Sequence, residues 1–285
     1  MTLGDITIAR VVEMEGPMMR PEDLLPAATP EMLDLHRPWL EPHYLSPSNI
    51  LIMSIQSFVV RTSQRTILVD TCVGNDKQRS NPSWTNLQLP YLRDLKAAGF
   101  SPEDIDVVLC THMHLDHVGW NTKLKDGRWV PTFPNARYLF TQVEWDFWKE
   151  RPPVQSYNHP CIDDSVLPVI DSGQADLVKT DESIDGSAWL EFAPGHTPGH
   201  VTLHLESDES EAVLAGDIFH HPLQVAEPQL RTEYLDIDPE AAEATRIDVL
   251  NRSTDEEVLI LGSHFANPSG GWIRTEDRSR RFIPA

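Results

Sequence analysis

The segment THMHLDHVGW, residues 111–120, gathers His112, His114, Asp116 and His117 within six consecutive positions. Bringing these imidazoles together costs desolvation and, once they are protonated, mutual repulsion. A bound cation would offset that cost, because imidazole and carboxylate groups are common metal ligands. Alternating residues of an extended segment point to one side, so positions 112, 114 and 116 should face together. The segment therefore predicts a metal site.

Three later segments offer further ligands. His196 lies in APGHTPGH, Asp217 in LAGDIF and His264 in LGSHF, each directly after a short apolar run and beside glycine or another small residue. That pattern places a side chain at the end of a strand with little bulk around it. Seven ligands exceed the needs of one tetrahedral zinc but suit two ions. Because a carboxylate can bridge two cations, Asp217 is the expected bridge.

The composition limits the class of protein. With 285 residues, 40% of them hydrophobic, the chain should form one large globular domain or two small ones. No apolar run reaches about 18 residues, so we expect no membrane helix. The first residues show no basic region followed by an apolar one, so we expect no secretion signal. The net charge of −21 and the lack of a basic cluster argue against a nucleic-acid partner. Three cysteines without a CxxC pair favour a reducing cytoplasm.

Residues 1–48 are rich in proline and methionine. They predict a strand near 6–14 followed by an extended arm with one short helix, all part of the same domain as the remainder. Two interpretations of the arm stay open: it wraps a neighbouring subunit, or it is a surface loop.

Residues 49–285 alternate between strand and helix patterns. Asp238 followed by Pro239 is typical of a helix start. Prolines at 152, 153, 160 and 168 predict a loop over 151–170. The pattern indicates two packed mixed sheets with helices outside, an α/β sandwich. The predicted strands are 49–62, 65–74, 106–112, 136–141, 188–194, 200–207, 211–217 and, as the last strand, 258–264; the predicted helices are 89–100, 144–150 and 239–251.

The segments THMHLDH, PGHTPGH, AGD and GSH, in this order, resemble the metallo-β-lactamase superfamily of metallohydrolases. VDTCVG at 69–74 resembles the aspartate-glycine loop of that family, with Asp70 in its acidic position. The resemblance spans about residues 50–265 and implies a four-layer αβ/βα sandwich, with 49–285 as the hydrolase domain. It implies that one ion is held by His112, His114 and His196, that a second is held by Asp116, His117 and His264, and that Asp217 bridges them.

Several branches of the superfamily fit poorly. Secreted β-lactamases need export, and many place cysteine or serine where Asp217 stands. Glyoxalase II-like thioesterases add a helical C-terminal domain, whereas only 21 residues follow His264 here. Flavodiiron relatives carry glutamate in place of His114. The remaining resemblance is to stand-alone lactonases, including acyl-homoserine lactonases, and to methyl-parathion-hydrolase-like organophosphate and ester hydrolases.

The expected reaction is the opening of a lactone or related ester by a hydroxide held between two divalent ions. Zinc is the first expectation, with iron, cobalt or manganese as alternatives. Asp116 or Asp217 would pass a proton to the leaving alkoxide. Three alternatives stay open: an organophosphate or aryl-ester hydrolase, a mononuclear-iron oxygenase resembling persulfide dioxygenases, and a non-catalytic binding protein on this fold.

The substrate pocket should be apolar with a few polar groups. We expect Trp120, Phe219, His220 and Phe265 to contact a small apolar ester or lactone, with core packing as the alternative for the aromatic residues. His200 is expected to support the structure, and for both His220 and His221 two interpretations stay open: the side chain lines the pocket, or it caps a loop. Known lactonases often use a tyrosine beside the metals, for which Tyr157 and Tyr234 are candidates. The resemblance also implies a homodimer.

Overall fold

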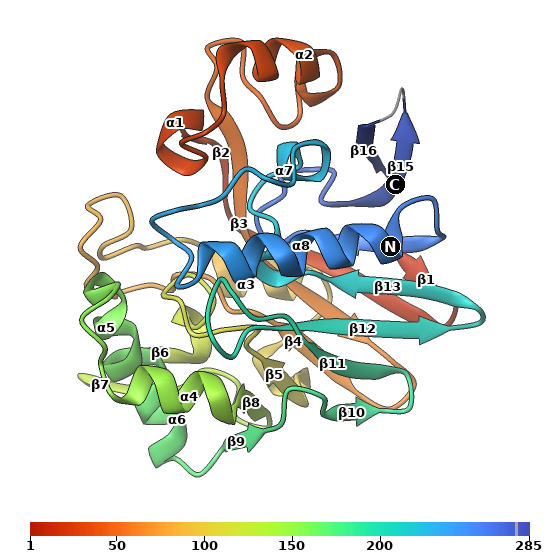
Figure 1. Cartoon of the computed structure of the whole chain (residues 1–285). Helices are drawn as coiled ribbons and strands as arrows, with labels where there is room; N and C mark the ends of the chain where they lie inside the picture. The colour runs from red at the N-terminus through yellow and green to blue at the C-terminus, as the bar shows by residue number, and fades with distance from the viewer. Residues whose placement is uncertain (277–278) are drawn as a thin grey trace.

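The computed structural model describes residues 1–276 and 279–285. Within them two seven-stranded mixed sheets pack face to face, with helices on the outside (Figure 1). The first sheet has the order β1 (Thr2–Leu3), β2 (Ile6–Met19), β3 (Leu51–Arg61), β4 (Thr66–Val69), β5 (Val107–Leu109), β8 (Arg137–Thr141), β9 (Ala175–Val178). The second runs β10 (Ser183–Asp185), β11 (Ala188–Phe192), β12 (Val201–Ser207), β13 (Ser210–Leu214), β14 (Val258–Leu261), β15 (Gly270–Glu276), β16 (Ser279–Pro284). The predicted α/β sandwich is confirmed.

Parallel pairing brings the predicted ligands to one edge. In the first sheet β4, β5 and β8 are parallel, with Val69 opposite Leu109 and Leu109 opposite Leu139. In the second sheet β13 and β14 are parallel, with Leu214 opposite Leu261. Since the carboxyl ends of parallel strands lie at the same edge, the segments that follow them meet there.

Three hydrophobic clusters hold the layers together. Ile67 and Val69 of β4 and Leu203 of β12 belong to the cluster between the sheets. Leu68 belongs instead to the cluster under the helices of the first sheet, as expected from the alternation of side chains along a strand. The third cluster packs α8 (Pro239–Ser253) on the outer face of the second sheet (Figure 1). Asp238 caps α8 through Oδ1, which accepts a hydrogen bond from the Ala241 amide at 3.0 Å, as the sequence predicted.

The first 48 residues are more structured than predicted. Strand β2 continues to Met19, and two helices follow, α1 (Pro21–Leu24) and α2 (Pro30–Leu40), where the sequence predicted one. The Thr29 hydroxyl caps α2 by accepting a hydrogen bond from the Met32 amide at 3.3 Å. Leu33 and Leu40 of α2 are buried, which anchors the arm against the body of the domain.

Two other predictions were wrong. Residues 151–170 are largely helical, with η3 (Ser156–Asn158), α5 (His159–Cys161), the π-helical η4 (Ile162–Val166) and α6 (Leu167–Asp171). Pro160 and Pro168 stand in the first turn of α5 and of α6, where proline is tolerated, so these prolines do not break the helical stretch. Strand β14 is not the last, because the hairpin β15–β16 follows it.

The remaining elements lie between strands of the same sheet. No helix of the described residues is long and apolar enough to cross a membrane. The connecting elements are α3 (Tyr91–Ala97), η1 (Pro102–Asp104), η2 (Gly119–Asn121), β6 (Thr122–Lys125), β7 (Arg128–Pro131), α4 (Gln142–Lys149), η5 (Gly216–Ile218) and α7 (Leu223–Ala226).

Candidate metal centre

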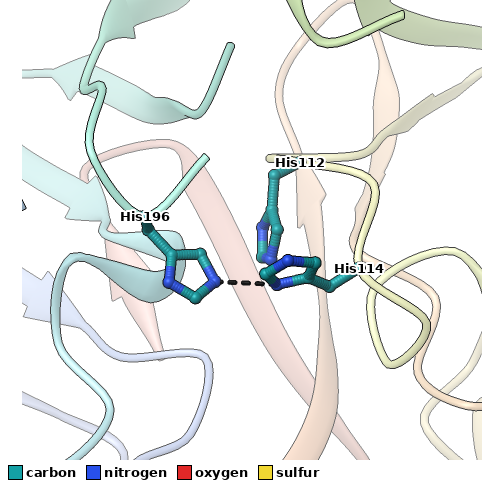
Figure 2. Close-up of side chains that lie close together, drawn as sticks. All are labelled: His112, His114 and His196. Carbon is teal, nitrogen blue, oxygen red and sulfur yellow. Dashed lines mark hydrogen bonds between the residues drawn. The ribbon is translucent and has the colours of Figure 1, made fainter. Parts of the chain in front are cut away.

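Three histidines form one ligand group. His112 and His114 lie in the loop after β5, and His196 lies in the loop after β11. Figure 2 shows the three rings turned toward one another, with His196 Nε2 at 2.9 Å from His114 Nδ1. One nitrogen of each ring lies within 4.8 Å of the others. The first sheet supplies two members of this group and the second sheet supplies one.

Asp116, His117 and His264 form a second group with the same spacing limit of 4.8 Å. His117 Nε2 lies 3.9 Å from Asp116 Oδ1, and His264 Nε2 lies 3.7 Å from Asp116 Oδ2. Asp217 is placed between the two groups. Its Oδ1 lies 3.3 Å from His117 Nε2, and its Oδ2 lies 3.3 Å from His196 Nε2 and 3.1 Å from His264 Nε2.

The residues present fit divalent metal ions. Among the described residues, His112 Nε2, His117 Nε2 and Asp217 Oδ1 are buried without a hydrogen-bond partner. Buried polar atoms without partners are costly, and inside a cluster of imidazoles and carboxylates a cation would satisfy them. Imidazole nitrogen and carboxylate oxygen are the donors that zinc, iron, cobalt and manganese accept.

In each histidine of these two groups, the ring nitrogen that faces away from the centre has a hydrogen-bond partner. Such partners hold the ring and the tautomer, and they leave the other nitrogen facing the centre. The contacts are His112 Nδ1 with Thr111 Oγ1 at 3.1 Å, His114 Nε2 with Gln155 Oε1 at 2.7 Å, His117 Nδ1 with Asp70 Oδ2 at 2.8 Å, His196 Nδ1 with Asp236 Oδ1 at 2.8 Å, and His264 Nδ1 with the Ser54 carbonyl at 3.0 Å. The sequence resemblance had identified Asp70, but Asp236 and Gln155 were missed.

The charges in the centre are strongly coupled. Burial lowers the pKa of His112 and His114 well below its usual range, which keeps them neutral and able to bind a cation. Burial also opposes the charge on Asp217, but the neighbouring His117, His264 and His220 outweigh it and hold the Asp217 pKa well below the ordinary value. The carboxylate is thus ionised, as a bridging ligand must be.

A glycine shapes the turn that presents Asp217. Gly216 has φ +54°, and a Cβ there would lie 2.4 Å from His200 Nε2. The close approach lets His200 Nε2 accept a hydrogen bond from the Asp217 amide at 2.9 Å. His200 therefore supports the turn. His221 has the loop-capping role, since Nε2 contacts the Tyr44 carbonyl at 2.8 Å and Nδ1 accepts from the Leu223 amide at 3.1 Å.

A cavity of about 810 Å³ opens over the ligand groups. His220 and Tyr157 line it, together with an apolar wall of Met14, Met18 and Met19 from β2. This wall could not be predicted from the sequence, because residues 14–19 lie far along the chain from the ligand motifs.

Three of the predicted substrate contacts are corrected. Trp120, Phe219 and Phe265 are buried and do not appear in the lining of this cavity within the described residues. The Trp120 ring stacks on Tyr91 at 5.3 Å, and the rings of Phe219 and Phe265 pack 6.3 Å apart under the second sheet. Tyr234, one of the two tyrosine candidates, is 75% exposed and outside the lining, whereas Tyr157 is inside it.

Glu13 of β2 fastens the loop that follows β4 beside the metal centre. Its carboxylate accepts hydrogen bonds from the Val73 amide at 2.8 Å, the Gly74 amide at 3.1 Å and Trp120 Nε1 at 2.7 Å. Burial nevertheless raises the pKa of Glu13 from 4.5 to about 7.

This raised pKa predicts a pH-dependent stability. An unfolded chain releases the Glu13 proton near pH 4.5, whereas the native protein keeps it to about pH 7, so between these values the native state binds more protons. The contribution of Glu13 to stability should fall as pH rises, by up to ~1.4 kcal/mol per pH unit. Denaturant unfolding of wild type and Glu13→Gln at several pH values measures this, with exposed Glu22→Gln as the control. Parallel curves for wild type and Glu13→Gln would contradict the assignment.

A sandwich of two mixed sheets with histidines and aspartates clustered at the edge where β5, β13 and β14 end is the metallo-β-lactamase fold. The chain belongs to the metallo-beta-lactamase superfamily, whose family model matches residues 53–264.

Known proteins with similar sequences include N-acyl homoserine lactonases. The chain is 25% identical over 182 residues to an N-acyl homoserine lactonase of Bacillus cereus, a match that covers 60% of this chain and 65% of that protein. It is 30% identical over 124 residues to the N-acyl homoserine lactonase AttM of Rhizobium radiobacter, covering 42% of this chain and 43% of that one. The chain thus matches 65% or less of the length of these two relatives.

Solved structures agree with the fold over the whole chain. The hydrolase AbOPH of the β-lactamase superfamily superposes with a TM-score of 0.82 and 27% identity, covering 100% of this chain and 96% of that one. AidC, a dizinc quorum-quenching lactonase in complex with a product, N-hexanoyl-L-homoserine, superposes with a TM-score of 0.76 and 20% identity. This match covers 100% of this chain and 96% of that one. At that identity the second likeness shows the fold alone.

Proposed function

We propose that the protein is a metal-dependent hydrolase that opens the lactone ring of N-acyl homoserine lactones. The observation that carries the proposal is the position of Asp217 between two ligand groups on the floor of a cavity with an apolar wall. The similarity to N-acyl homoserine lactonases supports the substrate class. The apolar wall suits an acyl chain, and the ligand groups suit the lactone carbonyl.

In this proposal two divalent ions occupy the centre, with zinc as the first candidate. His112, His114 and His196 would hold one ion, Asp116, His117 and His264 the other, and Asp217 would bridge them. When bound, such ions polarise the carbonyl and supply a hydroxide nucleophile at neutral pH.

The two aspartates are proposed to have different roles, proton transfer and metal bridging. Both aspartates line the cavity, but the Asp116 side chain is 13% exposed, whereas that of Asp217 is 4% exposed and surrounded by imidazoles. Asp116 is therefore the carboxylate whose oxygen can pass a proton to the leaving alkoxide, and Asp217 stays in place as the bridge.

His220 is the group that orients the substrate. It lines the cavity with Nε2 at 3.2 Å from Asp217 Oδ2, and neither of its ring nitrogens has a hydrogen-bond partner among the described residues. The histidines of the two ligand groups each have a partner behind the ring, so His220 differs from them. Because neither ring nitrogen of His220 is engaged in a hydrogen bond with the described part of the protein, the ring can donate one to a substrate oxygen.

An aryl-ester or organophosphate hydrolase is the second candidate. Trp84 and Tyr157 in the cavity lining offer flat surfaces on which an aryl group could stack. A mononuclear-iron oxygenase would need only part of the ligand set found here.

The test is a hydrolysis panel on metal-reconstituted enzyme, with the metal content measured on the same sample. The panel holds short-chain and long-chain N-acyl homoserine lactones, simple γ- and δ-lactones, aryl esters and a phosphotriester. We expect lactone opening that a chelator abolishes, with two zinc-like ions per chain. Preference for the aryl ester or phosphotriester would favour the second candidate, and one iron with no hydrolysis would favour the oxygenase.

We also propose a homodimer in a reducing cytoplasm, with residues 1–48 forming one domain with 49–285. Cys72, Cys110 and Cys161 are buried and unpaired, and β2 pairs with β3 along its length, which support the second and third of these proposals. Light scattering on the purified chain tests the dimer, and a monomer at micromolar concentration would exclude it.

A further inference from the structure

A buried carboxylate outside the ligand set connects the two loops that carry the three-histidine group. Glu144 lies in the first turn of α4 and is 1% exposed. Its Oε1 accepts hydrogen bonds from the Met113 amide at 2.9 Å and from Trp148 Nε1 at 2.7 Å. Its Oε2 accepts a hydrogen bond from the Gly199 amide at 2.9 Å.

These contacts reach both loops that carry the first ligand group. Met113 stands between His112 and His114, in the loop after β5 of the first sheet. Gly199 stands three residues after His196, in the loop after β11 of the second sheet. The Glu144 carboxylate therefore spans from one sheet's loop to the other's, on the side away from the cavity, whose lining does not include it.

The approach of the second loop to α4 is unusually close. A Cβ on Gly199 would lie 2.2 Å from the Glu144 amide nitrogen, so only glycine fits there. Thr141, the N-cap of α4, accepts a hydrogen bond from the Glu144 amide at 3.2 Å and donates one to the Gly199 carbonyl at 2.8 Å. The start of α4 thus fixes both the N–H and the C=O of Gly199.

We propose that Glu144 is a positioning residue that sets the distance between the His112–His114 loop and the His196 loop, and thereby the affinity of the three-histidine group for its ion. This inference rests on the metal binding in the proposed function but not on the substrate. A carboxylate is needed because all three contacts are N–H donors and both oxygens must accept. An amide of the same shape can accept on one side only, so one loop is released.

The experiment is a Zn²⁺ and Co²⁺ titration of metal-free wild type and Glu144→Gln against a competing chelator. His196→Ala and His264→Ala identify which binding step belongs to which ligand group. For Glu144→Gln we expect the step lost in His196→Ala to weaken about tenfold to a hundredfold, with an altered Co²⁺ absorption spectrum. The step lost in His264→Ala should change less than about threefold.

Val169→Ala is the matched control, because Val169 is fully buried in the same hydrophobic cluster as Trp148 and its apolar side chain holds neither loop by a hydrogen bond. It should lower the melting temperature and leave both metal steps unchanged. Thr141→Val, which removes only the contacts of the hydroxyl, should weaken the same step by a smaller factor and serves if Glu144→Gln does not fold.

Equal weakening of both steps, or no weakening in a folded Glu144→Gln protein, would overturn the proposal. Wild-type protein that binds two ions yet opens no lactone would count against the proposed substrate, while the titration would still decide the role of Glu144.

Discussion

Replacing Asp217 by asparagine should lower the metal occupancy below two ions per chain and reduce the rate of lactone opening at least a hundredfold. The Asp217 carboxylate presents Oδ1 to His117 and Oδ2 to His196 and His264, at 3.1 to 3.3 Å. Asparagine offers one neutral oxygen and an NH₂ group, whose protons would point toward the ligand nitrogens or the cation. Metal analysis after dialysis and steady-state kinetics measure both effects.

Asp248→Asn is the matched control, since Asp248 lies on the exposed face of α8 with a side chain 66% exposed. It should leave metal content and rate unchanged. An Asp217→Asn protein with two ions per chain and near-normal activity would contradict the bridging role. Circular dichroism separates loss of the bridge from loss of the fold.

The clustering of the candidate ligands could be predicted because it depends on strand ends. His112, Asp217 and His264 each follow a short buried strand, and parallel pairing of those strands brings the three to one edge. Strand, turn and ligand are all local patterns in the sequence, so their arrangement in the fold follows once the sheet order is known.

The outer partners of these histidines could not be predicted in this way. Gln155 and Asp236 approach the centre from loops far along the chain, and each touches a single histidine. Their positions depend on how those loops pack, for which the sequence has no periodic signal. The role of Glu144 could not be predicted from the sequence for the same reason, since its partners include the backbone amides of Met113 and Gly199.

The aromatic predictions failed because nearness in sequence does not fix direction. Phe265 directly follows His264, but residues 262–265 form a turn, in which the Phe265 amide donates a hydrogen bond to the Gly262 carbonyl at 3.3 Å, and the Phe265 ring is buried in the core. The 3₁₀ turn η5 ends at Ile218, and Phe219 has an extended backbone (φ −127°, ψ 124°), so the side chains of residues 219 and 220 point to opposite sides. His220 therefore faces the cavity, while Phe219 is buried in the core.

The same geometry leads to the second large effect, which we expect for His220→Phe. This change keeps a flat ring of similar size but removes both nitrogens. If His220 donates a hydrogen bond to the substrate oxygen as charge develops there, kcat should fall on the order of a hundredfold. KM should change little and the metal content should stay at two ions, because neither ring nitrogen of His220 has a hydrogen-bond partner within residues 1–276 and 279–285, unlike the outward-facing nitrogens of the ligand histidines.

His220→Gln separates hydrogen bonding from ring packing, because its side-chain amide can donate to the same oxygen. It should recover part of the lost kcat, whereas a role in packing alone would favour phenylalanine over glutamine. Loss of one metal equivalent in His220→Phe would instead make His220 a ligand of the group it forms with His196 and Asp217, whose donor atoms lie within 4.8 Å of one another. An unchanged kcat with two ions bound would exclude both roles of His220 and leave Asp116 as the one side chain to which this proposal gives a proton transfer.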